Sequence, residues 1–193
     1  GLGGLGLCAA GLLERLGATG ILLSSRSAYA SAALDSGRAN RLANRSLIAC
    51  DVGDATQTSY LLTRNAPVGV LHAAGVLHDR LLRSAAPGEI VSVFAPKATA
   101  GRHIQMATVS HPLAGATFFS SIASVFGNVG QVSYAAANAY LDAAALRTCL
   151  RGTVCSSLQI PPVTGAGMGS DTFNAEQLQT IGSAITMNIF VQA

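Results

Sequence analysis

Short apolar runs alternate with longer mixed segments along this chain, and both kinds of segment predict regular structure. Five runs predict buried strands of a parallel sheet, because they lack the strict alternation of a strand with one wet face. They lie at Ile21 to Leu23, Leu47 to Cys50, Val68 to Ala73, Ala116 to Phe119 and Val154 to Ile160. The intervening segments predict helices at Leu7 to Leu16, Thr56 to Arg64, Pro87 to Val109 and Tyr134 to Leu150. The fold class that follows is α/β, with a Rossmann-like doubly wound parallel sheet.

The beginning and the end of the sequence depart from this rhythm. Residues 1–6 read GLGGLG, a turn that normally follows a strand, and no strand precedes it here. We therefore expect a sheet without its first strand, in a fragment of a longer multidomain chain. Residues 1–193 contain no repeat and no Pro-rich linker, which predicts one domain. Glycines after Pro161 predict a substrate lid at 161–182.

The composition excludes several classes of protein. Half of the 193 residues are apolar and only 11% are charged, so we expect a folded chain with a large core and not a disordered one. The net charge of +3 (12 − 9) is scattered along the chain, which argues against nucleic acid as a partner. The first residues carry no basic region and no cleavage site, so they do not resemble a signal peptide.

A mean hydropathy of +0.43 makes a membrane segment worth testing. The stretch between Arg102 and Asp142 has no charged residue, but it contains histidines, Asn138 and many Ser, Thr and Gly residues. That composition fits a buried active centre and not a membrane span. The four cysteines show no spacing typical of a metal site. They predict reduced core residues of a cytoplasmic protein without a metal.

Two features predict a dinucleotide site that prefers NADPH. The glycine cluster stands directly before a predicted helix, where bare backbone can approach a pyrophosphate and the helix N-terminus offers free N–H groups. About twenty residues on, at the end of the next predicted strand, Ser25 and Arg26 suit a 2′-phosphate, whereas an NAD site usually has an acid there. The alternatives are a glycine turn without function and a solvated surface arginine.

The ends of two further strands would complete this site. One predicted strand closes on Asp51 and Val52, and the next closes on Ala73, Ala74 and Gly75. Small residues at these ends leave room for adenine and ribose, and a carboxylate can accept from the adenine amino group. Asp51 is equally well explained as a turn or a helix cap. We expect His72 to be a core histidine with its hydrogen bonds satisfied, and not a catalyst.

The sharpest candidate chemistry lies between the last two predicted strands. Ser121 ends a strand, and Tyr134 and Asn138 share one face of the following helix because they are four residues apart. A tyrosine is a poor acid near neutral pH unless a cation favours its phenolate. Lys97 follows Pro96, a residue favoured in the first turn of a helix. Taken singly, Lys97 could be a solvated first-turn lysine and Tyr134 a core aromatic residue.

These segments, in this order, resemble a known family. The segments are GLGGLG, LLSSRS, CDVGD, VLHAAGVLHD, VFAPKATAG, FFSSIAS and GQVSYAAANAYLDA. They resemble the catalytic subdomain of a ketoreductase from a modular polyketide synthase or an animal-type fatty acid synthase, a branch of the short-chain dehydrogenase/reductase superfamily. The resemblance extends from Gly1 to about Met168.

The resemblance implies a role for each candidate residue. Tyr134 would donate a proton to the nascent alkoxide, and Ser121 would hydrogen-bond the substrate carbonyl. Lys97 would lower the pKa of the tyrosine and bind the nicotinamide ribose, and Asn138 would complete the tetrad through a water relay. Most superfamily members have the lysine where this chain has Asn138, and the exchanged arrangement is typical of synthase ketoreductases.

The same resemblance assigns the NADPH contacts. Arg26, with Ser25 beside it, would take the 2′-phosphate, and Asp51 and Val52 would take the adenine. The glycine-rich turn would hold the pyrophosphate, and the end of the fourth strand would line the central part of the cofactor. The remaining residues of these two groups are Gly1, Leu2, Gly3, Gly4, Leu5, Ala73, Ala74 and Gly75.

The implied reaction is the NADPH-dependent reduction of a β-ketoacyl thioester. The substrate would be tethered to the phosphopantetheine of an acyl carrier protein, beside the other domains of the same synthase. Asp79 stands where members that give D-alcohols have their second Asp, and Phe126 replaces the Trp of L-alcohol members, so we expect the D-3-hydroxy product. The segment 159–162 departs from the family pattern, which leaves the acyl chain open. The alternatives are a non-catalytic structural domain of a megasynthase and a free-standing short-chain reductase.

Overall fold

The computed structural model describes residues 2–28, 46–111, 113–164 and 185–186. The chain divides into two compact units, residues 1–50 with 161–193 and residues 51–160, and each unit is described by itself. Gly1 and the greater part of the predicted lid at 161–182 lie outside the described residues.

The first unit contains a helix and two pairs of parallel strands. Helix α1 (Gly4–Arg15) is followed by β1 (Leu22–Ser25) and β2 (Ser46–Ala49), which pair in parallel. The short strands β6 (Val163–Thr164) and β7 (Ile185–Thr186) form the second pair. An apolar cluster joins α1 to β1 and consists of Leu2, Leu7, Ala10 and Leu23. This packing places the turn before α1 next to the strand that ends at Ser25.

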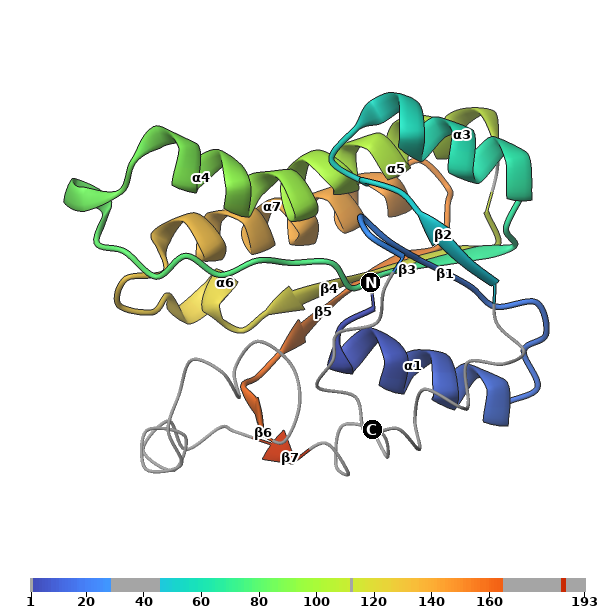
Figure 1. Cartoon of the computed structure of the whole chain (residues 1–193), viewed down its shortest axis with the longest axis horizontal. Coiled ribbons are helices and arrows are strands. Elements are labelled where there is room, and N and C mark those ends of the chain that lie inside the picture. Colours follow the sequence, from blue (N-terminus) through green and yellow to red (C-terminus); the bar gives the residue numbers. More distant parts are fainter. Residues whose placement is uncertain (1, 29–45, 112, 165–184, 187–193) are drawn as a thin grey trace. The chain divides into compact units, whose positions relative to one another are not determined.

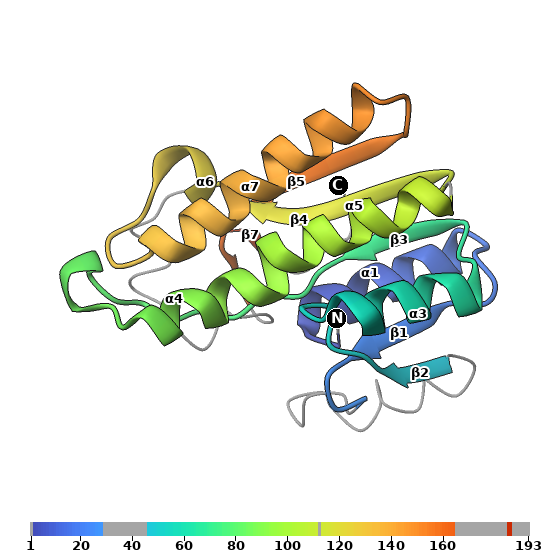
Figure 2. The ribbon, with the colours of Figure 1, turned by 90° about the horizontal axis from the view of Figure 1, so that it is seen from above.

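The second unit is a three-stranded parallel sheet with helices over one face. Its strands run in the order β3 (Gly69–His72), β4 (Gly115–Ser121) and β5 (Cys155–Ile160). Figures 1 and 2 show α4 (Pro87–Phe94), α5 (Ala100–Ser110) and α7 (Val132–Cys149) over the same face of this sheet. Helix α3 (Ala55–Asn65) packs beside α5, and α6 (Ala123–Phe126) packs against α7.

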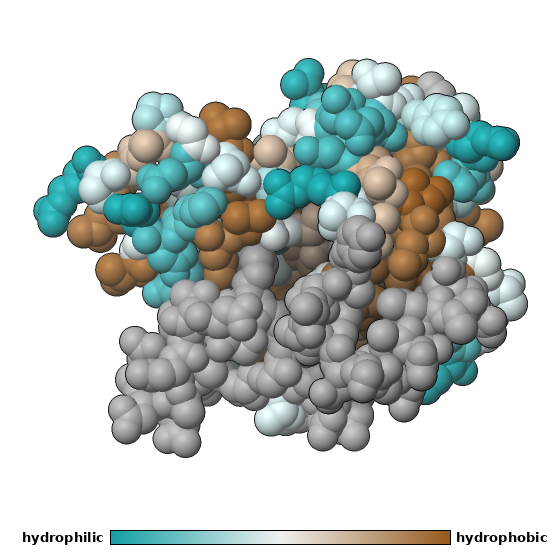
Figure 3. Space-filling view, in the orientation of Figure 1, coloured by the Kyte–Doolittle hydropathy of each residue, from teal (hydrophilic) through white to brown (hydrophobic). Residues whose placement is uncertain are grey.

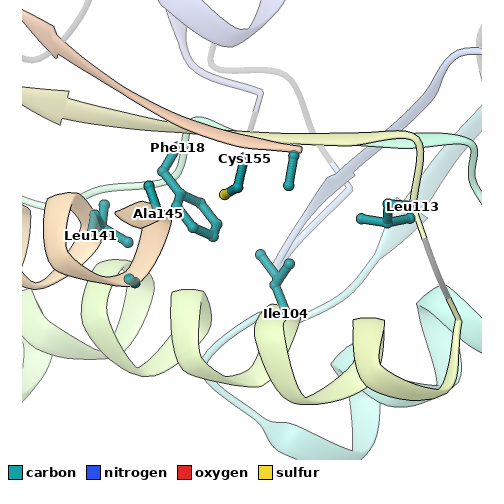
Figure 4. Packing of buried hydrophobic residues seen from close by; sticks show 8 residues of the cluster. Ile104, Leu113, Phe118, Leu141, Ala145 and Cys155 are labelled. Carbon is teal, nitrogen blue, oxygen red and sulfur yellow. The ribbon is translucent and has the colours of Figure 1, made fainter. Parts of the chain in front are cut away.

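The core of this unit lies between the sheet and the helices. Phe118 and Cys155 point from β4 and β5 toward Leu141 of α7 and Ile104 of α5 (Figure 4). Phe118 and Leu141 are 1% and 0% exposed, and full burial of such a side chain stabilises a fold by roughly 1.5–3 kcal/mol. The packing fixes β4 against α7, which are the two elements that carry Ser121 and Tyr134.

The apolar runs predicted β1 to β5 close to their observed positions but not the short strands β6 and β7, and the α/β class with Rossmann-like parallel sheets is confirmed. The predicted helix from Pro87 to Val109 is not continuous, because a π-helical turn, Ala95–Thr99, separates α4 from α5. Pro96 explains the interruption, since it has no N–H to donate and its ring clashes with the preceding turn of a regular helix. Lys97 therefore lies in a widened turn inside the helical segment and not in a first turn.

The described helices present both polar and apolar side chains to solvent, and Met106 and Val109 are among the exposed apolar ones. Hydrophilic residues gather over α3 (Figure 3), whose exposed side chains include Gln57, Arg64 and Asn65. Among the described residues, no helix combines the length and the apolar character that crossing a membrane would require.

Candidate active site

Ser121 is the last residue of β4, and the short helix that follows fixes its side chain. Its Oγ accepts a hydrogen bond from the backbone N–H of Ala123 at 3.2 Å. Because this oxygen already accepts from the main chain, its own O–H proton is free to donate in another direction. Ser121 is half-buried at the carboxyl end of a parallel strand, which is where ligands bind in open α/β sheets.

The π-helical turn directs Lys97 into the interior. The side chain is only 3% exposed, and its Nζ donates to the carbonyl oxygen of Phe119 at 2.9 Å. The same Nζ lies 5.3 Å from the centroid of the Tyr134 ring, within the range of a cation–π contact. Burial lowers the pKa of Lys97 to about 8, although the charge of Asp142 acts in the opposite direction. The solvated first-turn lysine considered as an alternative is therefore wrong.

Tyr134 and Asn138 lie on consecutive turns of α7. Asn138 is fully buried, and its Nδ2 donates to the carbonyl oxygen of Tyr134 at 2.8 Å. The carbonyl oxygen of Asn138 accepts from the Ser120 hydroxyl at 3.3 Å. The Oδ1 atom of Asn138 is buried and has no hydrogen-bond partner among the described residues. A buried acceptor without a partner carries a free-energy cost, so it marks a point where a further donor would be stabilised.

The structure corrects the expected acidity of Tyr134. Burial raises the pKa of its hydroxyl above the ordinary value, while side-chain hydrogen bonds with Asn138 and Ser121 act in the opposite direction. The negative charge of Asp79 also raises this pKa. The net lowering expected from Lys97 is wrong for this arrangement, because removing the phenolate from water outweighs the effects that favour it. Tyr134 thus holds its proton firmly near neutral pH.

Two loops near Tyr134 are joined by hydrogen bonds that were not predicted. The Nε2 atom of the buried Gln131 donates to Oδ2 of Asp79 at 3.0 Å, and the N–H of Arg80 donates to the carbonyl of Gly130 at 2.8 Å. Asn128 donates to Oε1 of Gln131 at 3.1 Å. The loop that follows β3 is therefore tied to the loop that leads into α7. The family resemblance indicated Asp79, but no pattern in the sequence indicated its partner Gln131.

A cluster around Asp142 was also missed. This half-buried carboxylate lies one turn beyond Asn138 on α7 and accepts from side chains of α6 and β5. The spacing of Tyr134, Asn138 and Asp142, each four residues from the next, would have placed all three on one helical face.

The turn before α1 has the features of an anion site. Gly3 is the N-cap residue, no side chain caps the helix, and its first turn has no acidic residue. A Cβ placed on Gly3 would meet no atom within 4 Å, so the backbone faces open space there. A helix N-terminus of this kind offers N–H groups and positive potential to a phosphate. Of the other predicted residues, Leu2 is buried directly before Gly3, and Gly4 and Leu5 are the first two residues of α1.

The residues after β1 contribute a cation and a hydroxyl. Arg26 is exposed, and the Oγ atom of Ser25 is buried without a hydrogen-bond partner among the described residues. The backbone carbonyl of Ser25 accepts from the N–H of Cys50 at 2.9 Å, so the strand end itself is fixed.

Asp51 takes part in a local turn. Its Oδ1 accepts from the N–H of Gly53 at 2.9 Å, and its own N–H donates to Oε1 of Gln57 at 2.9 Å. The carbonyl of Val52 accepts from the Thr58 hydroxyl at 3.1 Å. This is the turn alternative considered for Asp51, and Asp54 is the residue that caps α3. An adenine contact of Asp51 and Val52 stays a prediction.

The end of β3 places a buried histidine beside small residues. His72 is 4% exposed and packs edge-on against Phe118, with ring centroids 6.0 Å apart. Burial and the charge of Lys97 lower the pKa of His72 to about 3, so it is neutral near neutral pH. Its Nε2 has no hydrogen-bond partner among the described residues, which corrects the expectation of a satisfied core histidine. Half-buried residues follow it directly: Ala73, Ala74 and Gly75.

The unit of residues 51–160 thus brings Ser121, Lys97, Tyr134 and Asn138 together. The model of the KR domain family matches residues 1–165 of the chain. The chain belongs to the KR domain family. Its solved relatives are ketoreductases of polyketide synthases, and ketoreductases of this superfamily are oxidoreductases.

Relatives of this KR domain include polyketide synthases and a solved ketoreductase of such a synthase. Polyketide synthase GfsA of Streptomyces halstedii is 44% identical over 115 residues, which cover 58% of this chain and 2% of that protein. Hybrid PKS-NRPS synthetase ucsA of Acremonium sp is 32% identical over 173 residues, which cover 87% of this chain and 4% of that protein. A solved structure described as A-type ketoreductases from a modular polyketide synthase superposes with a TM-score of 0.83 at 30% identity, covering 98% of this chain and 42% of the solved one.

Proposed function

We propose that this KR domain reduces a carrier-protein-tethered β-ketoacyl thioester to the β-hydroxyacyl thioester with NADPH. The observation that carries the proposal is the position of the Lys97 amine, 5.3 Å from the centroid of the Tyr134 ring. Ser121 and Asn138 lie close enough to the same tyrosine to affect its pKa. A hydroxyl pair beside a buried cation is the donor set that a carbonyl oxygen needs when negative charge develops on it.

The residues of the first unit fit the cofactor. The uncapped N-terminus of α1 and the open space at Gly3 suit a pyrophosphate. The exposed guanidinium of Arg26 and the Ser25 hydroxyl, which has no partner in the part of the chain that the structure describes, suit a phosphate on the ribose. NADPH, when bound, supplies hydride to the substrate carbonyl carbon.

The side chains at the end of β4 would handle the oxygen of the substrate. Ser121 donates its O–H to this oxygen, because its Oγ accepts from the N–H of Ala123 and is fixed by it. Tyr134 keeps its proton until an alkoxide forms, since burial raises the pKa of the phenol. As the proton leaves, the nearby ammonium group of Lys97 stabilises the phenolate. The Oδ1 of Asn138, which has no partner within the described ranges, is the acceptor that a water relay to Lys97 would use.

The D-3-hydroxy configuration of the product is part of the proposal. Asp79 supports it, because this carboxylate is fixed by Gln131 beside the loop that precedes α7. Phe126, which occupies the position of the Trp in L-alcohol members, is 81% exposed. The partners would be an acyl carrier protein domain and other domains of the same synthase, as in the multidomain relatives.

The test is a reduction assay on the intact protein with a β-ketoacyl thioester of pantetheine. We expect NADPH absorbance to fall and chiral chromatography to give the D-3-hydroxy product. If the protein consumes no NADPH and does not change NADPH fluorescence on titration, the proposed function is refuted. The alternative of a non-catalytic structural domain would then stand. Reduction to the L-alcohol would refute only the stereochemical part.

A further inference from the structure

Asp142 has no task in the proposed chemistry, although it lies beside the residues that do. It follows Asn138 by one turn of α7 and Tyr134 by two, so the three side chains share a helical face. Its carboxylate accepts three side-chain hydrogen bonds. The donors are Ser124 Oγ at 2.7 Å, Ser157 Oγ at 2.6 Å and Gln159 Nε2 at 2.9 Å.

These donors come from two different elements. Ser124 belongs to α6, whereas Ser157 and Gln159 belong to β5. The carboxylate of Asp142 therefore joins three elements: α6, α7 and β5. Burial by itself raises the pKa of Asp142, but the hydrogen bonds from these donors and from the Ser120 side chain of β4 outweigh burial and hold the pKa below its ordinary value. The group is ionised near neutral pH, and hydrogen bonds to an ionised acceptor are stronger than neutral ones.

Helix α6 depends on such an anchor. It has four residues, and a helix of a single turn is not stable on its own. It begins two residues after Ser121, and the N–H of its first residue, Ala123, donates to the Oγ of Ser121 at 3.2 Å. The direction of the Ser121 hydroxyl thus depends on the position of α6, and Ser124 ties α6 to Asp142.

We propose that Asp142 is a positioning residue for Ser121, acting through Ser124 and the N–H of Ala123. This inference rests on the proposed function for its kinetic consequence, but the structural link stands on its own contacts. Asp142 does not touch the reacting atoms. It holds the turn that aims the hydroxyl at the substrate oxygen, and geometry of this kind affects turnover more than substrate affinity.

The first test compares Asp142→Ala with Asp142→Asn in the intact protein. We expect Asp142→Ala to lower kcat about tenfold or more, with KM changed less than about threefold. On the plateau of kcat at low pH, where Lys97 is charged in every variant, asparagine should restore most of kcat, because its Oδ1 can accept from Ser124 and Gln159 while its Nδ2 donates to the Ser157 hydroxyl. Equal losses of kcat in both variants would overturn the proposal, because they would make the charge and not the geometry responsible.

Serine variants identify the path. Ser124→Ala removes the bond to α6 and should lower kcat about fivefold, and the double variant with Asp142→Ala should lose little more, since both act through one contact. Ser157→Ala removes a bond to β5 and leaves α6 attached, so its loss should be smaller. Ser156→Ala is the matched control, because this exposed neighbour on β5 contacts Thr117 and not Asp142, and its kcat should equal that of the wild type.

Amide hydrogen exchange tests the link without turnover. In Asp142→Ala and Ser124→Ala, exchange over residues 123–126 should become at least about tenfold faster, whereas exchange in α5 should not change. Unchanged exchange there and an unchanged kcat would overturn the proposal. If Asp142→Ala does not fold, Ser124→Ala decides the question, because it leaves Asp142 its two donors on β5. An inactive wild type would refute the proposed function, and the exchange measurement would still decide the role of Asp142.

Discussion

The turn before α1 and the polar centre at the end of β4 satisfy their polar groups in different ways. At the turn, no side chain caps the helix, and the Ser25 hydroxyl has no partner among the described residues. At the centre, Lys97 and Ser121 are each fixed by the main chain, through Phe119 and Ala123. The first region is suited to an external ligand, whereas in the second region internal bonds fix Lys97 and Ser121, and the buried Oδ1 atom of Asn138 has no partner among the described residues. Changes at the turn should therefore alter cofactor binding, and changes at the centre should alter turnover.

The largest expected effect comes from Tyr134→Phe. This change removes one oxygen from the centre and leaves the turn before α1 intact, so kcat should fall by ~10²–10⁴-fold, the usual contribution of general acid catalysis. Turnover is followed by NADPH absorbance, and cofactor affinity by fluorescence titration. A large loss of NADPH affinity in this variant would contradict the separation of the two regions.

The next effect concerns the cation after β1. Arg26→Ala should weaken NADPH binding about 10–100-fold, because a charge-assisted hydrogen bond to a phosphate is lost. NADH, which has no 2′-phosphate, should bind nearly as before. The control is Arg102→Ala, which removes another exposed arginine, on α5. Equal losses for both cofactors would make Arg26 a surface residue only.

The pH dependence of turnover tests the buried cation. With its pKa lowered to about 8, Lys97 loses its charge above that pH, so kcat should fall about tenfold for each further pH unit. The neighbouring groups do not titrate in this range, since the pKa of His72 is about 3, that of Asp142 is lowered and that of Tyr134 is raised.

Asp142→Asn should move this decline to lower pH, because the negative charge of Asp142 raises the pKa of Lys97. The shift is measured from the basic limb of the kcat profile. A constant kcat from neutral pH to well above 8 would contradict the role of the ammonium group.

The smallest effects come from a pair of glycines. A Cβ on Gly101 would lie 2.6 Å from Cδ2 of the fully buried Leu141, so Gly101→Ala should destabilise the fold by about 1–3 kcal/mol. A Cβ on Gly3 would meet nothing within 4 Å, so Gly3→Ala should change stability by less than about 1 kcal/mol. It should, however, weaken NADPH binding by crowding the pyrophosphate. Denaturant unfolding measures the stability of both variants, and fluorescence titration measures their affinity for NADPH. Equal losses of stability and of affinity in the two variants would contradict the comparison.

Most of the sheet was predictable from the sequence, because buried parallel strands are short apolar runs that differ clearly from the longer mixed segments of the helices. Val154 to Ile160 and Ala116 to Phe119 were found at nearly their observed positions. The π-helical turn at Lys97 was not predicted. Periodicity across Pro87 to Val109 is helical throughout, and Pro96 alone does not say whether a helix starts, ends or widens there.

The candidate site was predicted in its residues but not in its electrostatics. Spacing placed Tyr134 and Asn138 on one face, and the structure brings Lys97 to the same ring. The raised pKa of Tyr134 and the bond between Gln131 and Asp79 depend on burial and on loop contacts between distant segments. Neither leaves a periodic signal in a single sequence. Asp142 differs from these features: it was missed, although its spacing of four residues from Asn138 is visible in the sequence.

The ammonium group of residue 97 is held by a peptide oxygen, and every amino acid that can stand at position 119 supplies that same oxygen. Mutational drift there can replace the phenyl ring without removing the anchor. A carboxylate partner would be lost through a single codon change. Because the acceptor is a main-chain atom, substitutions at position 119 preserve it, whereas contacts made by the surrounding side chains can be lost by substitution.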